Sequence, residues 1–167
     1  MQEPNPFISY LEALRDNRAA LAHLRRGLGQ PAGTVADMYR YVVPWLGEES
    51  PPWQEEAYYL VAALFAYHPA AGGHGNMGDH FRRVRDAQGE DSATDRRFNA
   101  LLAAHPDDLD TYLRQAVGFL RSQETPVNWH QLLSDVMAWG HPDKYVQRAW
   151  ARAYWGRREE IRSEEAI

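Results

Sequence analysis

The sequence predicts an all-α fold of about seven to eight helices, either as one compact bundle or as two small helical lobes that share a core. Apolar residues recur with helical spacing along most of the chain, and Gly, Pro and Asn stand where these patterns begin and end. No segment shows the sustained alternation that is typical of strands. With 167 residues and a hydrophobic fraction of 44%, the chain is predicted to form a single domain over 1–167.

Three helices are expected in the first part of the chain. Residues 1–6 contain two prolines and are predicted to be extended and frayed. A leucine stripe then predicts a helix over 7–28, and a shorter helix is expected over 35–43. The segment 53–68 is acidic in its first turn and apolar on nearly every side beyond it. This pattern indicates a central helix surrounded by others.

The second part is expected to begin with a loop. Segment 70–78 is rich in glycine and has no hydrophobic period, so we expect a mobile loop there. A short helix follows, in which Phe81 and Val84 are buried and the nearby arginines point largely outward. Four further helices are predicted over 93–104, 106–123, 128–139 and 142–156, and the charged tail 157–167 is expected to be frayed.

Metal and cofactor chemistry is not expected. The chain has no cysteine, so it has neither a disulfide framework nor a thiolate metal site. His68, His74 and His80 are evenly spaced, but no helical period brings them together and no carboxylate joins them. We therefore predict no metal site and no cofactor.

Catalysis is not expected either. The chain has no G-x-S-x-G, H-E-x-x-H or Walker motif, and no carboxylate is placed to orient a histidine as a general base. The sequence thus predicts no enzyme and no small-molecule substrate. No apolar run has transmembrane length and no basic segment leads into an apolar one at the N-terminus, so we expect a cytoplasmic protein outside the membrane.

The cations of this chain are almost all arginine. Of its 18 basic residues only Lys144 is lysine, although the net charge is −5. Arginine presents a planar fork of donors that suits phosphate, and it stacks on rings. An arginine-rich genome would explain the same count, so the placement of the arginines has to decide between these explanations.

Several arginines stand beside apolar stripes that do not need them. Arg114 and Arg121 lie two turns apart and share one helix face. Arg25 and Arg26 have no acidic neighbour three or four positions away. Further cations lie in the first two turns of the 93–104 helix, where the helix dipole opposes them, and at every fourth position of the last helix: Arg96, Arg97, Lys144, Arg148 and Arg152. An anionic ligand is one explanation for such positions.

Five stretches resemble the CasB family, the small subunit of the Cascade surveillance complex of type I-E CRISPR systems. They cover nearly the whole chain in the right order: ALAHLRRGLG (20–29), YVVPWL (41–46), EEAYYLVAALFAYHP (55–69), TDRRFNALLAAHPDDLDTYLRQAVGFLRS (94–122) and PVNWHQLLSDVMAWGHPDKYVQRAWARAYWG (126–156). The N-terminal leader, the glycine loop and the acidic tail match least.

The resemblance implies a non-catalytic helical subunit, present as a pair, that contacts the backbone subunits and the large subunit of a crRNA-guided complex. It also implies contact with target DNA and crRNA, which stabilises the R-loop by way of backbone contacts. The residues it implies for nucleic-acid binding are Arg25, Arg26, Arg96, Arg97, Arg114, Arg121, Lys144, Arg148 and Arg152. Arg82, Arg83 and Arg85 rank lower because they lie where the match is poorer.

An alternative role fits the same residues. The arginines would then pair with acidic patches on neighbouring subunits, and the protein would be a protein–protein scaffold. Salt dependence separates these two roles, because binding to a polyphosphate strand falls steeply as ionic strength rises.

Overall fold

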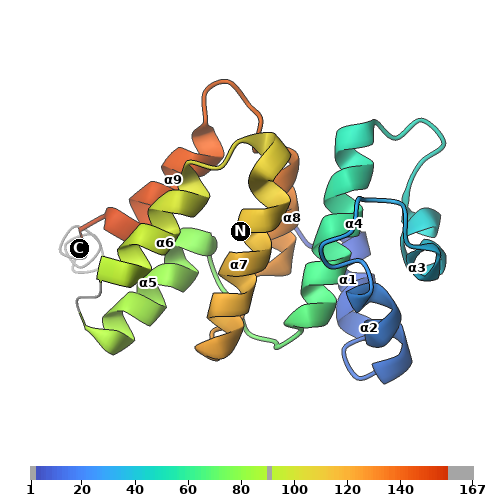
Figure 1. Ribbon diagram of the computed structural model, residues 1–167, viewed down its shortest axis with the longest axis horizontal. Coiled ribbons are helices and arrows are strands. Elements are labelled where there is room, and N and C mark those ends of the chain that lie inside the picture. Colours follow the sequence, from blue (N-terminus) through green and yellow to red (C-terminus); the bar gives the residue numbers. More distant parts are fainter. Residues whose placement is uncertain (1–2, 90–91, 158–167) are drawn as a thin grey trace.

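The computed structural model describes residues 3–89 and 92–157. Within these residues the chain forms nine α-helices, three short 3₁₀ helices and no strand, which confirms the all-α prediction (Figure 1). The predicted fraying of the two ends falls partly on residues 1–2 and 158–167, which lie outside the described residues. No helix in the described part of the chain has the length and apolar character needed to cross a bilayer.

The α-helices follow one another with short connections. Their bounds are α1 Pro6–Ala13, α2 Arg18–Arg25, α3 Tyr39–Val42, α4 Pro52–Tyr67, α5 Met77–Gln88, α6 Ser92–Leu102, α7 Leu109–Ser122, α8 Trp129–Met137 and α9 Tyr145–Trp155. The 3₁₀ helices are η1 Ala36–Met38, η2 Val43–Trp45 and η3 Pro106–Asp108.

Helix α4 is the centre of the fold, as its sequence predicts. It packs against α2, α3, α7 and α8, so other helices cover most of its surface (Figure 1). Leu64 and Phe65 are fully buried, and nine of its 16 residues are buried. A helix that is apolar on nearly every side is stable only when it is enclosed in this way.

The predicted first helix over 7–28 is wrong in one respect, because the chain breaks it into α1 and α2. After Leu14 the chain makes a tight turn, and the Asn17 side chain accepts a hydrogen bond from the N–H of Ala20. An asparagine that caps a new helix in this way competes with continuation of the old one. This break accounts for nine helices in place of the eight that the sequence pattern separates.

Two other predicted boundaries also moved. Within 35–43 only four residues are α-helical, since 3₁₀ turns occupy both ends of the segment. Helix α5 begins at Met77, where Asn76 and Asp79 form a reciprocal capping box, so the connection after α4 ends at Asn76 and not at residue 78 as predicted. Within that connection Gly73 lies so close to the backbone of Val127 that a Cβ would be 2.2 Å from its carbonyl carbon. The mobility of this loop stays a prediction.

Candidate nucleic-acid interface

Two arginines of the N-terminal segment bind carbonyl groups where α4 ends. Arg15 Nε donates to the carbonyl oxygen of Pro69 at 2.6 Å, and Arg25 Nη1 donates to that of Ala66 at 3.4 Å. Ala66 lies in the last turn of α4, where carbonyl groups have no partner within the helix and carry partial negative charge, so a cation is favoured there. Pro69 follows two residues after the helix ends. The end of α4 thus collects positive charge from the segment that contains α1 and α2.

Two more arginines lie on rings next to this end. The guanidinium carbon of Arg121, on α7, is 4.9 Å from the centre of the Tyr67 ring at the end of α4. That of Arg97, on α6, is 4.9 Å from the centre of the Phe119 ring on α7. Stacking on a ring fixes the plane of a guanidinium and leaves its N–H edge free for an anion.

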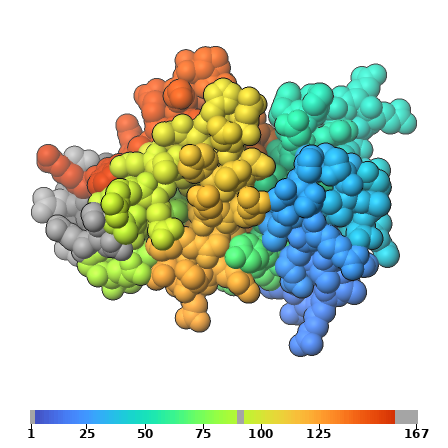
Figure 2. Space-filling model, in the orientation of Figure 1, coloured from blue at the N-terminus to red at the C-terminus, as the bar shows by residue number. Residues whose placement is uncertain are grey.

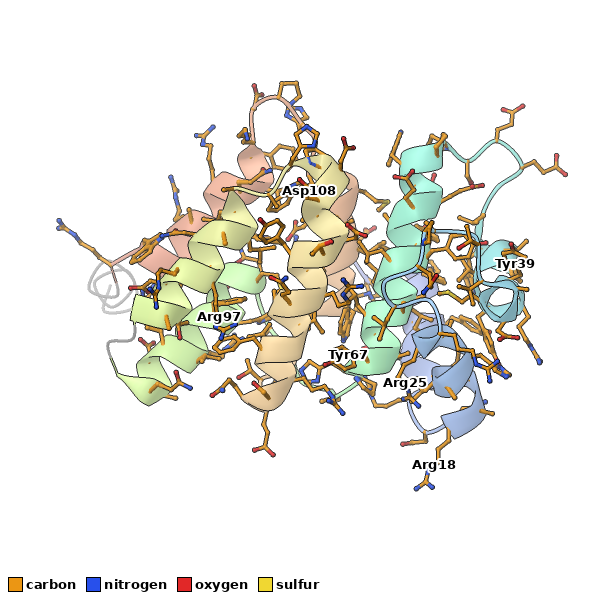
Figure 3. The ribbon with its side chains drawn as sticks, viewed as in Figure 1. Arg18, Arg25, Tyr39, Tyr67, Arg97 and Asp108 are labelled. Atoms are coloured by element: carbon orange, nitrogen blue, oxygen red, sulfur yellow. The ribbon has the colours of Figure 1, made fainter. Side chains whose placement is uncertain are left out.

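These contacts join three exposed arginines from separate helices into one line, which we call the arginine row: Arg25, Arg121 and Arg97. Arg25 donates to the carbonyl oxygen of Ala66, and the ring of the next residue, Tyr67, lies under Arg121. Phe119 is on the same helix as Arg121, and its ring lies under Arg97. Figure 3 shows Arg25, Tyr67 and Arg97 along one side of the molecule, on α2, α4 and α6. The row therefore extends across the fold, with α7 in the middle.

Three residues that contribute to this surface are not indicated by the sequence. The nearby Glu12 explains the charge of Arg15 as an ion pair within the segment, and that pair does form at 3.6 Å. Tyr67 and Phe119 look like ordinary apolar residues, because nothing local shows that an arginine from another helix covers their rings. In the structure both rings are half-buried, which leaves one face of each open to an arginine, and the sequence does not show this.

The other predicted arginines differ in whether another group of the chain engages their charge. Arg96 is exposed on α6. Arg26 forms an ion pair with Asp37, and the hydrogen bond from Arg26 is the main cause that lowers the pKa of that carboxyl group. The sequence shows no acid near Arg26 because Asp37 is 11 positions away. The charge of Arg26 is therefore largely balanced within the chain.

The expectation that Arg82, Arg83 and Arg85 point outward is wrong for two of them. Arg82 Nη1 donates to the carbonyl oxygen of Ala153 at 3.1 Å, and Arg85 lies 4.4 Å above the Tyr154 ring. Both side chains are folded onto α9, because α5 and α9 pack closely together. Arg83 is exposed but donates to the carbonyl oxygen of His74 at 2.7 Å.

The last three predicted cations lie on another part of the molecule. Helix α9 starts at Tyr145 and not near Pro142, and Lys144 precedes it in the left-handed conformation with φ 51°. Lys144, Arg148 and Arg152 are all exposed. Because α9 packs on α5 and α6, it lies on the side of α6 away from α4 (Figure 1). These cations form a second basic surface, separate from the arginine row.

The evenly spaced histidines include two that serve the packing of the chain. His68 Nε2 lies 2.7 Å from the carbonyl oxygen of Thr125, and His80 Nε2 accepts the backbone N–H of Asn128 at 3.0 Å. Burial, with a smaller effect of the Arg83 charge, lowers the pKa of His80 to about 3. Within the described residues, no three His, Asp or Glu side chains come together as a metal site.

One histidine does have an orienting carboxylate, which the sequence pattern does not indicate. His130 Nε2 lies 2.6 Å from Glu12 Oε1. Its other ring nitrogen, Nδ1, accepts the backbone N–H of Asn5 at 2.9 Å. A general base needs one free ring nitrogen, and here both are engaged. The pair instead fastens the first turn of α8 to α1.

Comparison with known proteins identifies the family that shares this geometry. The family model "CRISPR-associated protein Cse2" matches residues 20–155. The chain belongs to the Cse2 family. A curated Cse2 protein of Thermus thermophilus is 35% identical to this Cse2-family chain over 157 residues, which are 90% of this chain and 88% of that protein. The resemblance read from the sequence is therefore confirmed.

Solved structures agree in fold over nearly the whole length. The crystal structure of CasB from M. ruber is 30% identical, with a TM-score of 0.78 and 99% of each chain covered. A chain of a CRISPR RNA-guided surveillance complex in a pre-nicking state is 27% identical, with a TM-score of 0.80 and 96% of each chain covered. The match with M. ruber CasB includes the N-terminal segment that carries Arg15 and Arg25, since it spans nearly all of this chain.

Proposed function

We propose that this Cse2-family chain is the non-catalytic small subunit of a Cascade-type, CRISPR RNA-guided surveillance complex. A related chain occurs in such a complex, and this chain matches it over 96% of its length. Within the complex the subunit contacts the backbone subunits, the large subunit and a second copy of itself. Its task is to stabilise the R-loop that forms when the crRNA pairs with target DNA.

The arginine row is the observation that carries the nucleic-acid part of this proposal. Its cations come from α2, α6 and α7 and are held in one line by contacts with Ala66, Tyr67 and Phe119. Guanidinium groups that are held in place can donate charge-assisted hydrogen bonds to the phosphates of a strand. Base pairing supplies the sequence specificity of an R-loop, so contacts with the sugar–phosphate backbone are sufficient.

The remaining predicted cations take graded roles in this proposal. Arg96 extends the row on α6, and a second strand contact is offered by Lys144, just before α9, with Arg148 and Arg152 on α9. Arg26 contributes less because Asp37 balances its charge. Arg82 and Arg85 hold α5 to α9 and are not assigned to the interface. The net charge of −5 keeps the protein from binding bulk nucleic acid.

A matched pair of substitutions tests the row. Arg121→Ala removes a guanidinium over Tyr67, and Arg40→Ala removes one that lies 5.3 Å above Tyr41 on α3. Both lose a similar cation–π contact, but only Arg121 belongs to the row. We expect Arg121→Ala to weaken binding of a single-stranded oligonucleotide and to lower the salt slope by up to about one phosphate contact. Arg40→Ala should leave both quantities unchanged.

The scaffold alternative gives a different result in the same experiment. If Arg121→Ala binds the oligonucleotide normally but no longer enters the assembled complex, the row is a protein interface. Equal loss in Arg121→Ala and Arg40→Ala would show that binding follows total charge and not the row.

A further inference from the structure

A cavity of about 850 Å³ opens beside the central helix. It lies where α4 meets α7, the end of α8 and the segment 27–33. The space-filling view shows the seam between α7 and the N-terminal part of the chain (Figure 2). Its apolar wall includes Trp53, Leu60, Ala63, Leu64, Met137 and Ala138. Trp53 is 57% exposed, which leaves a large ring at the edge of the cavity. A cavity of this size and character is typical of a binding site.

The wall of the cavity contains the guanidinium group of Arg114. Arg114 lies half-buried in the wall, with Nη1 so near Gly29 that a Cβ on this glycine would be 2.3 Å away. Gly29 has φ +74°, so the absence of a side chain serves both the backbone conformation and the room for Arg114. Among the described residues, no hydrogen bond or ion pair engages the Arg114 guanidinium. Half-buried donors of this kind favour a charged acceptor.

The rim of the cavity argues against a nucleic-acid occupant. Glu56, Asp107 and Asp110 line it and are exposed, so three carboxylates face the solvent near a single arginine. A phosphate strand would meet repulsion from these groups, and this distinguishes the cavity from the arginine row. The charges instead suit a segment with its own apolar body and with charges of both signs.

We propose that this cavity receives an apolar segment of a partner protein in the complex, a segment that brings one carboxylate to Arg114 and basic side chains to Glu56 and Asp110. A large apolar side chain of the segment fills the space between Leu60 and Met137. This inference rests on the proposed place of the chain in a multi-subunit complex. It assigns Arg114 to protein recognition, apart from Arg121 on the same helix.

Photo-crosslinking in the assembled complex identifies the occupant. The photoreactive residue p-benzoylphenylalanine replaces Ala32, which is exposed and lines the cavity, or Ala87, which is exposed on α5 outside it. We expect position 32 to form an adduct with a protein segment that has a large apolar residue beside an Asp or Glu, and position 87 not to. An adduct with nucleic acid alone, or no adduct in a complex that has assembled, overturns the proposal.

Two different substitutions test how much the cavity contributes to binding the partner, so the test does not depend on the folding of a single variant. Arg114→Met removes the cation and Ala32→Trp fills the mouth of the cavity. Arg114→Met should weaken incorporation into the complex by about 10-fold to 100-fold, the loss expected for a charge-assisted hydrogen bond. Ala32→Trp should also weaken incorporation, because the indole occupies the space that the partner segment needs. Both variants should change oligonucleotide binding by less than about twofold. If Arg114→Met weakens oligonucleotide binding as much as Arg121→Ala does, Arg114 belongs to the strand interface and the proposal fails. If Arg121→Ala has no effect on strands while both cavity variants still lose incorporation, the nucleic-acid function fails and the cavity proposal stands.

Discussion

Acidification should destabilise this fold through His80, whose ring is held neutral in the folded chain. Its Nε2 accepts the backbone N–H of Asn128, which caps α8, so protonation at Nε2 would break that hydrogen bond. Burial lowers the pKa of His80 to about 3, against an ordinary value of about 6.5. In the unfolded chain the same ring takes up a proton as pH falls below about 6.5.

The size of the effect follows from these two pKa values. Between about pH 6.5 and pH 3 the unfolded state binds more protons than the folded state, so stability falls as pH falls. At pH 5 the unfolded chain is favoured about 30-fold by this one site, which corresponds to about 2 kcal/mol of lost free energy of unfolding. At about pH 7 the contribution of His80 to stability is almost fully present.

Urea unfolding followed by far-UV circular dichroism at about pH 7 and about pH 5 measures this loss. His80→Gln has no ionisable ring, so its stability should change between the two pH values by about 2 kcal/mol less than that of the natural chain. Asp135, whose pKa is raised by burial, makes the opposite contribution because acid favours its folded form. It is present in both proteins and cancels in the comparison. The same pH dependence in both proteins would refute the assignment to His80.

Two further predictions concern packing. Leu64 is 0% exposed, so Leu64→Ala should lower the free energy of unfolding by about 2–5 kcal/mol in urea unfolding. Val43 is 50% exposed, so the control Val43→Ala should change it by less than about 0.5 kcal/mol. A smaller loss for Leu64→Ala would mean that α4 is not the centre of the core. Gly78→Ala should lower the free energy of unfolding by about 1–3 kcal/mol, since the added Cβ would lie 2.1 Å from the carbonyl oxygen of Trp150. In the control Gly47→Ala the added Cβ meets only a side chain at 3.5 Å, so the free energy of unfolding should stay unchanged. Equal melting temperatures for the two alanine variants would contradict the close contact of α5 with α9.

Features that depend on neighbours along the chain can be predicted from the sequence. Apolar spacing predicts most of the helices. The segment around Leu64 is apolar on nearly every side, which predicts its central position. The errors of the sequence prediction are local too. The leucine stripe continues across the turn at Asn17 and hides it, and Pro142 predicts a start of α9 that is three residues too early.

Contacts between distant segments determine which arginines are free and where they gather. Arg26 meets Asp37, and Arg82 and Arg85 turn onto α9, although their local sequences look alike and equally cationic. Arg25, Arg121 and Arg97 come into one line because the end of α4 and the rings of Tyr67 and Phe119 lie between their helices. Helical period fixes the face on which an arginine stands, but the partner on that face comes from a distant segment. Long-range packing therefore decides the site, while the sequence pattern decides the helices that carry it.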